Sequence, residues 1–241
     1  MRNGNKIRKR SPSMRPVIST IIPVYQEGEA INQAIRHLRS IEGGICCEII
    51  VVDGHSDGNT LSAIDDGAVI RIRSTKGRGC QMNAGAQAAR GDILLFLHAD
   101  TLLPQNALSR IISIMENSAF AGGAFSLRIN GNPFFFRVIE RLTVLRARLT
   151  RIPYGDQGIF IRRDYFRKIG GYREMPILED VDLMRRIRKR GDRIVLLPEP
   201  VLTSSRRWDR NGLLCTTLRN RIIMVLYNLG IKPDRLLRFY S

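Results

Sequence analysis

The chain has 241 residues, of which 44% are hydrophobic, and its formal net charge at pH 7 is +17. This length allows one large domain, or one domain with a small extension, and no apolar run approaches the roughly 18 residues typical of a membrane span. The positive charge favours anionic partners such as nucleotide phosphates, lipid headgroups or nucleic acid. Residues 1–15 are basic with no long apolar segment behind them, which predicts a disordered tail rather than a signal peptide.

Strands and helices are predicted to alternate through the first half. Short apolar runs predict strands at Val17–Ile22, Glu48–Val52, Ala68–Ile72 and Ile93–Leu97. Helical spacing or composition predicts helices at Glu29–Ser40, at Gly79–Arg90, at Gln105–Met115 and in a short segment ending at Ile64. This alternation is typical of an α/β fold with a doubly wound, mostly parallel sheet, here through about residue 118.

The second half has a mixed pattern. Strands are predicted at Phe120–Ile129, Ile159–Ile161 and Ile194–Leu197, and helices at Pro133–Arg151, Asp180–Arg190 and Leu213–Leu229. We therefore expect one domain over residues 16–210, divided into halves at 16–118 and 119–210. Residues 211–241 are predicted to form a helical C-terminal extension.

Acidic residues follow two of the predicted strands and open a later helix. Asp53 follows the second strand, Asp100 follows the fourth, and Glu179 and Asp180 begin a helix. Ligands of open α/β sheets bind at the carboxyl ends of the strands. The pattern predicts a site for a phosphorylated ligand, a divalent metal and a catalytic base. The structural alternatives are a turn aspartate at 53 and helix N-terminal acids at 179 and 180.

Other polar residues near these positions are weaker candidates. Pro23 fixes the exit from the first strand, and Glu27 beyond it is placed to meet a ligand. Lys76 and Arg78 precede a helix rich in glycine and alanine, which suits phosphate contact as well as close packing on the sheet. No GxGxxG follows the first strand, so a dinucleotide-binding fingerprint is missing.

The four cysteines form no recognisable metal or redox motif. They are Cys46, Cys47, Cys80 and Cys215, with neither a CxxC pair nor a zinc spacing. We expect free thiols in a reducing compartment. This predicts a cytoplasmic protein.

Five segments, in order, resemble the family 2 glycosyltransferases of the GT-A fold. They are STIIPVYQE, VVDGHSDG, MNAGAQAARGDILLFLHAD, the GGY of Gly170–Tyr172 and LEDVDLMRRIRKRG, and they span roughly residues 18 to 191. The segment YGDQGIF and the later SSRRWDRNG further resemble a bacterial subgroup of small, single-domain transferases. The resemblance implies a GT-A sheet, a nucleotide-sugar donor, a divalent metal (Mn²⁺ or Mg²⁺) and inverting transfer to an acceptor hydroxyl.

The resemblance also implies roles for individual residues. Asp180 is the expected general base, and Glu179 supports the donor or acceptor. The expected donor-binding residues are Pro23, Tyr25, Glu27, Asp53, Arg78, Asn83, His98, Asp100, Arg207 and Trp208. The expected acceptor-binding residues are Gly155, Asp156 and Gln157. Asp100 is the expected metal ligand, the last residue of a DxD-like motif whose first position is His98, so a single carboxylate remains. Ligation by His98 would shift preference toward Mn²⁺.

Two predicted helices, Pro133–Arg151 and Leu213–Leu229, combine apolar residues with arginines. They either lie on an anionic membrane surface or pack on the sheet with a basic face to solvent. The first would suit a lipid-linked or otherwise hydrophobic acceptor, and a location at the cytoplasmic face of the membrane. The competing functions are a nucleotidyltransferase and a non-catalytic nucleic-acid-binding protein. The ordered acidic strand ends disfavour the second, so we expect no nucleic-acid partner.

Overall fold

The protein is described by a computed structural model covering residues 17–41, 47–131, 134–205 and 212–239. The predicted tail at residues 1–15 lies outside these ranges. One eight-stranded sheet has the order β3-β2-β1-β4-β7-β6-β8-β5. The strands are β1 (Ile18–Val24), β2 (Cys47–Asp53), β3 (Ile70–Arg73), β4 (Ile93–Phe96), β5 (Thr101–Leu102), β6 (Phe120–Ile129), β7 (Ile159–Arg162) and β8 (Arg193–Thr203).

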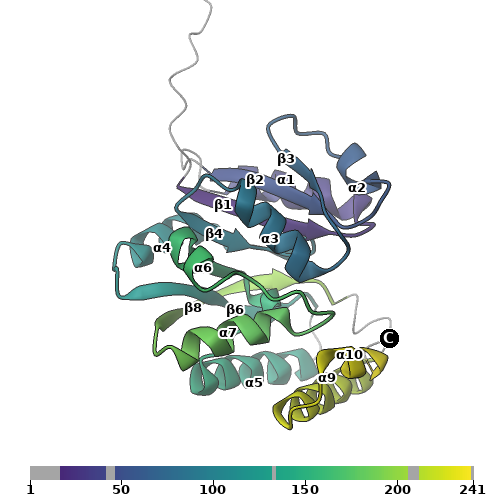
Figure 1. Ribbon diagram of the computed structural model, residues 1–241, viewed down its shortest axis with the longest axis vertical. Coiled ribbons are helices and arrows are strands. Elements are labelled where there is room, and N and C mark those ends of the chain that lie inside the picture. Colours follow the sequence, from purple (N-terminus) through teal and green to yellow (C-terminus); the bar gives the residue numbers. More distant parts are fainter. Residues whose placement is uncertain (1–16, 42–46, 132–133, 206–211, 240–241) are drawn as a thin grey trace, which may run out of the picture.

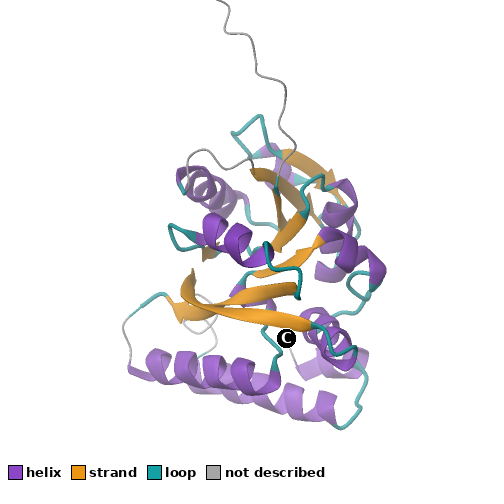
Figure 2. Ribbon diagram, turned by 90° about the vertical axis from the view of Figure 1, so that its left-hand side faces the viewer, coloured by secondary structure: helices purple, strands orange, loops and turns teal. Residues whose placement is uncertain are grey.

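Helices cover both faces of this sheet, as Figures 1 and 2 show. They are α1 (Gly28–Ser40), α2 (Asn59–Ser62), α3 (Arg78–Ala88), α4 (Ala107–Met115), α5 (Phe134–Thr150), α6 (Arg163–Lys168), α7 (Glu179–Lys189), α9 (Leu213–Asn228) and α10 (Pro233–Leu236). Short 3₁₀ turns lie at Gly155–Gln157 and Leu237–Phe239. Of the helices in the described parts of the chain, none has both the length and the apolar character needed to cross a bilayer.

The strand pairing confirms the predicted fold class. Strand β1 pairs in parallel with β2 and β4, and β2 pairs in parallel with β3. In the second half, β7 runs antiparallel to both β4 and β6, while β6 and β8 are parallel. The α/β class with a mostly parallel first half and a mixed second half is therefore correct.

Two strands end two or more residues later than the sequence predicts. Strand β1 continues through Pro23 to Val24, because its pairing with β2 extends to Asp53. Strand β8 continues through two prolines to Thr203, whereas the predicted strand stops at Leu197. The partner on the other side of β8 is β5, which pairs only near Thr203. The prolines therefore lie where β8 has one neighbour, and a missing N–H is tolerated at such an edge.

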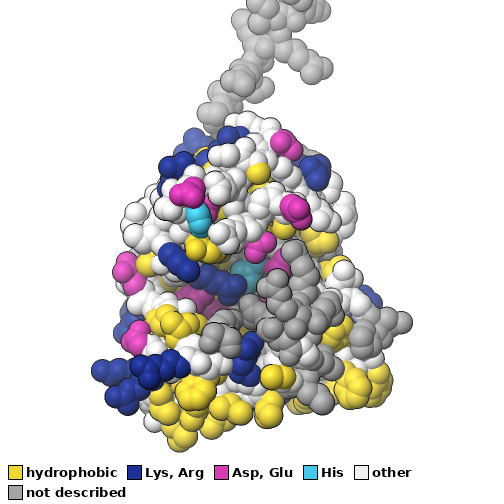
Figure 3. Space-filling model, turned by 90° about the vertical axis from the view of Figure 1, so that its right-hand side faces the viewer, with side chains coloured by type: hydrophobic (Ala, Val, Ile, Leu, Met, Phe, Trp, Pro, Cys, Tyr) yellow, Lys and Arg dark blue, Asp and Glu magenta, His cyan; other side chains and the backbone are white. Residues whose placement is uncertain are grey.

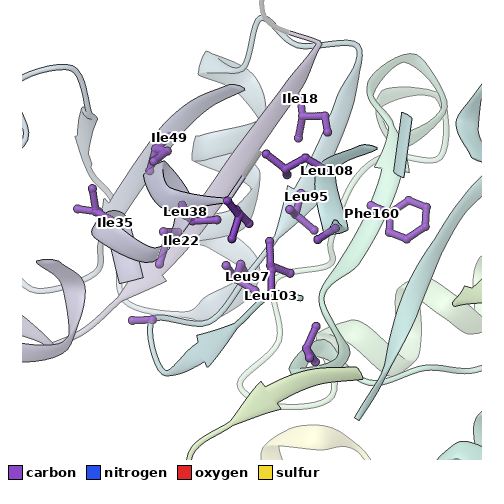
Figure 4. Packing of buried hydrophobic residues seen from close by; sticks show 14 of the residues in the cluster. Ile18, Ile22, Ile35, Leu38, Ile49, Leu95, Leu97, Leu103, Leu108 and Phe160 are labelled. Atoms are coloured by element: carbon purple, nitrogen blue, oxygen red, sulfur yellow. The ribbon is translucent and has the colours of Figure 1, made fainter. Parts of the chain in front are cut away.

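Alternate residues of the central strands enter two separate cores. From β1, Ile18 and Ile22 pack on one side with α1 and α4, while Ile21 packs on the other side with α3 and α7. Figure 4 shows the first of these cores, in which Ile22, Leu38 and Leu95 come from a strand, a helix and a neighbouring strand. A sheet buried on both faces reads as continuous apolar runs, which is why these strands are visible in the sequence.

Candidate active site

Asp53 is the last residue of β2 and is completely buried. Its Oδ1 accepts a hydrogen bond from the backbone N–H of His55, with an N–O distance of 2.9 Å. Its Oδ2 is buried and has no hydrogen-bond partner within the described part of the chain. A buried carboxylate oxygen without a donor is costly, so this atom suits a ligand that supplies an N–H or O–H.

Gln81, which the sequence does not single out, holds the strand ends beside Asp53. It lies on α3, and its Nε2 donates to the carbonyls of Val24 and Val52 at 2.6 and 2.8 Å. The amide therefore joins the last residues of β1 and β2, where the pairing between the two strands ends. A Cβ at Gly54 would come within 2.9 Å of Gln81 Cδ, so the glycine leaves room for this contact.

Tyr25, His55 and Lys76 form the rim beside Asp53. The Tyr25 and His55 rings have centroids 5.3 Å apart, and Lys76 Nζ lies 4.5 Å from the Tyr25 centroid. The backbone N–H of Glu27 donates to the hydroxyl of Thr60 at 3.1 Å, which ties the start of α1 to α2. An aromatic ring with a neighbouring cation suits a base and phosphate.

Asp100 lies after β4, at the same edge of the sheet, and is half-buried. Its Oδ1 is 3.4 Å from the Thr101 hydroxyl, and its carbonyl accepts the N–H of Ser204 at 3.2 Å. The expected donor-binding residues Arg207 and Trp208 lie outside the described residues, a short distance along the chain from Ser204.

Asp180 opens α7, and both of its carboxylate oxygens accept backbone N–H groups. Gly155 donates to Oδ2 at 2.5 Å, and Val181 donates to Oδ1 at 2.7 Å. The residue just before the helix, Leu178, has a left-handed backbone with φ of 67°. Such a conformation is costly for leucine and marks a position held by its surroundings.

Gly155 brings Asp180 and His98 together. A Cβ built on Gly155 would lie 3.3 Å from Asp180 Oδ2 and 3.4 Å from His98 Nε2. The end of β4, the 3₁₀ turn and the start of α7 therefore meet at this glycine. Asp180, predicted as the base, and His98, predicted as part of the DxD-like motif, are in one site.

We expect Gly155→Ala to lower turnover by up to about 100-fold, because small displacements of reacting groups have effects of that size. The new methyl group would press on both Asp180 and His98. The matched control is Gly67→Ala, since a Cβ there meets nothing within 4 Å. Steady-state kinetics and thermal unfolding of both variants check this, and unchanged turnover in Gly155→Ala would show that this spacing is not critical.

Glu179 has an acidity unlike that of an ordinary carboxyl group. It is 7% exposed, and its pKa is raised from 4.5 to about 7, first by burial and then by the charge of Asp180, while Arg78 opposes the shift. The folded protein therefore binds a proton between pH 4.5 and 7 that the unfolded chain releases. Arg78, on α3, is thus close enough to act on the acidic start of α7.

The shift predicts a pH-dependent loss of stability. Protonated Glu179 contributes on the order of 3 kcal/mol to the free energy of unfolding at low pH. This contribution should be lost as pH rises from 4.5 to 7, and it should be absent above the folded-state pKa. Glu179→Gln keeps the shape without the charge. Its stability relative to the wild type should therefore grow across this window in denaturant titrations, and a constant difference would contradict the assignment.

Arg146, from α5, lies beside the candidate site, although the sequence does not single it out. Its guanidinium carbon lies 3.4 Å from the centroid of the Tyr154 ring, and its Nη1 donates to the carbonyl of Ile152 at 2.7 Å. Its Nη2 is buried without a hydrogen-bond partner among the described residues. Burial lowers the pKa of this guanidinium, whereas Tyr154, Asp156 and Asp180 act to raise it. A cation with an unused donor thus lies beside Asp180.

Two predicted binding residues hold the protein's own backbone. The amide of Asn83 donates to the carbonyl of Tyr172 at 2.8 Å and accepts its N–H at 2.9 Å. Gln157 is buried, accepts from the N–H of Tyr154 and donates to the carbonyl of Phe125. Both amides position loops of the site, and Gln157 fixes the turn that presents Gly155.

The face seen in Figure 3 is the carboxyl edge of the central strands. A hollow crosses its middle, in which acidic and histidine surface lies among lysine and arginine. Among the described residues, no group of three or more His, Cys, Asp and Glu could hold a metal ion by itself. His98 and Asp100 supply an imidazole and a carboxylate, which are ligand types that bind divalent cations such as Mn²⁺.

Comparison with known proteins finds glycosyltransferases. The dolichol-phosphate mannosyltransferase of Pyrococcus furiosus is 27% identical over 142 residues, covering 55% of this chain and 40% of that protein. The undecaprenyl-phosphate 4-deoxy-4-formamido-L-arabinose transferase of Proteus mirabilis is 25% identical over 159 residues, covering 60% of this chain and 48% of that protein. The chain thus spans less than half the length of both relatives.

The structure of a mannosyltransferase from Pyrobaculum calidifontis, in complex with GDP-Man and Mn²⁺, has the same fold. The TM-score is 0.59 at 23% identity, covering 79% of this chain and 57% of that one. Residues 19–173 match the family model described as Glycosyl transferase family 2. This match includes the strand-end acids, His98 and Gly155, and the chain therefore belongs to glycosyl transferase family 2.

Proposed function

We propose that the protein is an inverting glycosyltransferase that moves a sugar from a nucleoside-diphosphate sugar to a lipid-linked acceptor, with Asp180 as general base. The observation that carries the proposal is the meeting of Asp180 and His98 at Gly155. The proposed base and the DxD-like segment both lie beside the Cβ position of this one glycine.

The donor's nucleoside is assigned to the Asp53 end of the site. The buried Oδ2 accepts an N–H or O–H from the base or ribose, and Tyr25 and His55 flank it. The relative of known fold was solved with GDP-Man, which supports a nucleotide-sugar donor for the family's fold without fixing the base for this chain.

The chemistry requires a base on one side of the sugar and a stabilised diphosphate on the other. Asp180 removes the proton of the acceptor as the acceptor oxygen attacks the anomeric carbon of the sugar. The bond between that carbon and the diphosphate oxygen breaks at the same time. Asp100 and His98 would hold a divalent cation, which when bound neutralises the leaving diphosphate. Arg78, at the start of α3, lies on the same edge and adds positive charge there.

The acceptor is assigned to the side formed by Tyr154, Asp156 and Arg146. The names of two relatives specify dolichol phosphate and undecaprenyl phosphate, which are lipids with an anionic head. The unused guanidinium N–H of Arg146 suits a polar or anionic group next to the acceptor oxygen. Cys47, Cys80 and Cys215 are free thiols, in keeping with work at the cytoplasmic face of a membrane.

A thermal-shift panel tests the donor and the metal together. UDP, GDP, CDP, dTDP and ADP, with their common sugars, are each added with Mn²⁺, Mg²⁺ or EDTA, because a ligand stabilises the folded state according to its occupancy. We expect one nucleotide to raise the unfolding temperature in a metal-dependent way, and Asp100→Ala to remove the metal dependence. No shift with any nucleotide would overturn the proposed function and favour a non-catalytic binding protein.

A further inference from the structure

Helix α5 exposes its apolar side. The side chains of Phe134, Leu145 and Leu149 are 75%, 53% and 77% exposed, and Phe135, Val138 and Leu142 share this side. The opposite side, against β6, carries the buried carboxylate Glu140, whose Oε1 accepts the N–H of Ile129 at 2.7 Å. This orientation is the reverse of a helix that packs on a sheet with a polar face to solvent.

Helix α9 shows the same arrangement. Leu218 and Leu229 are 62% and 75% exposed, Ile222 and Val225 lie on the same side, and Ile223 packs inward against Leu236 of α10. The two helices lie close together along one end of the molecule (Figures 1 and 2), and Arg221 of α9 acts on the pKa of Arg146 of α5. Figure 3 shows hydrophobic side chains gathered along this end. We call the exposed sides of α5 and α9 together the apolar face.

The charges on the apolar face are all positive. Arg141 and Arg148 on α5 and Arg221 on α9 are exposed. Glu140, the single acid in α5, is buried, and α9 contains no acid. Two copies meeting symmetrically through this face would bring arginines together with no acid of these helices between them. A bilayer surface with anionic lipids instead accepts both the arginines and the apolar side chains.

We propose that the apolar face of α5 and α9 docks on anionic lipid bilayers. Arg146, one turn after Leu142 at the edge of the apolar side of α5, contacts Tyr154 beside Asp180. The acceptor side of the site therefore lies within one helix diameter, about 10–12 Å, of the bilayer surface. This deepens the proposed function, on which it rests for the identity of the acceptor, by making that acceptor a lipid still resident in the bilayer.

Vesicle flotation of the full chain tests the docking. The vesicles are phosphatidylcholine alone, or phosphatidylcholine with phosphatidylglycerol, at moderate salt. We expect the protein to float with the anionic vesicles and not with the neutral ones. The triple variant Phe134→Ser, Leu142→Ser and Leu149→Ser, which changes exposed side chains only, should lose most of this binding while its circular dichroism and nucleotide thermal shift stay unchanged.

A charge-matched pair of variants separates docking from general attraction. Arg141→Gln with Arg148→Gln removes two charges from the apolar face, and Arg36→Gln with Lys168→Gln removes two exposed charges elsewhere. The first pair should weaken flotation more than the second. Equal weakening, or flotation that survives the triple variant because the basic N-terminal residues suffice, would overturn the proposal.

Two further results would also decide the matter. A dimer in sedimentation that the triple variant dissociates, without flotation of the wild type, would assign the apolar face to a second copy and reject the bilayer. Nucleotide binding without flotation would reject docking and leave the proposed transferase intact. Flotation without nucleotide binding would reject the proposed transferase and leave docking on the bilayer intact.

Discussion

Asp180→Asn should lower the rate of sugar transfer by about 10²–10⁴-fold, the usual contribution of a general base. The amide cannot accept the acceptor's proton. It also replaces one of two carboxylate oxygens that receive N–H groups from Gly155 and Val181, so one of those donors loses its partner. Rates of transfer under single-turnover conditions measure the effect, and calorimetry with the nucleotide measures donor binding, which should survive.

Asp182→Asn is the matched control on the same helix. Asp182 is buried and pairs with Arg173 at 3.2 Å and with Arg186 at 2.8 Å, so its loss should reduce stability while leaving turnover nearly unchanged. Equal losses of turnover in the two variants, or a loss of donor binding in Asp180→Asn, would mean that Asp180 holds the structure and is not the base.

Asp53→Asn should weaken nucleotide binding by roughly 10- to 100-fold, the value of a hydrogen bond to a charged group. The amide oxygen can still accept the N–H of His55, but an NH₂ group then replaces the oxygen that has no partner. The NH₂ group of the asparagine would then face the N–H or O–H of the ligand, and the two donors cannot hydrogen-bond to each other. The ligand-free variant should be no less stable than the wild type, since a buried charge is removed.

Asp57→Asn controls for the change in net charge. Its side chain is 65% exposed in the same loop, so nucleotide affinity should remain at the wild-type value. Isothermal titration of both variants compares them directly. Wild-type affinity in Asp53→Asn would remove Asp53 from the nucleotide site and point the search toward the rim at Tyr25.

The fold could be predicted from the sequence where helices cover both faces of the sheet. The strands at β1, β2 and β4 appear as unbroken apolar runs because α1 and α4 cover one face and α3 and α7 the other. The end of β8 could not be predicted. Its prolines are tolerated only because β5 is short and pairs with β8 beyond them. Which strand ends at a sheet edge is a property of the whole sheet and not of the local sequence.

The positions of the candidate acids at the ends of elements could be predicted, whereas the residues packed around them could not. Asp53, Asp100 and Asp180 follow or open elements that periodicity locates. Gln81 and Arg146 lie inside helices, where a glutamine or an arginine most often faces solvent. Only the packing of α3 on the sheet and of α5 on β6 turns these two side chains inward.

Which side of α5 is buried also had to come from the structure. The sequence shows a helix with apolar residues and arginines, and it favours neither side for packing. Glu140 decides the matter, because its buried carboxylate receives the N–H of Ile129 and pairs with Arg137 at 2.7 Å. A single polar anchor thus leaves six large apolar side chains facing out.

The exposed apolar side of α5 and the contact of Arg146 with Tyr154 together limit how the length of this helix can change in evolution. Successive residues of an α-helix are about 100° apart around its axis. One residue inserted between Leu142 and Leu145 would rotate Arg146 away from Tyr154 and bring a different side chain there. Insertions of about two full turns, near seven residues, would restore the phase. Descendants that keep both the exposed apolar side and the contact of Arg146 with Tyr154 should therefore vary in length at the ends of α5, or by insertions of about seven residues.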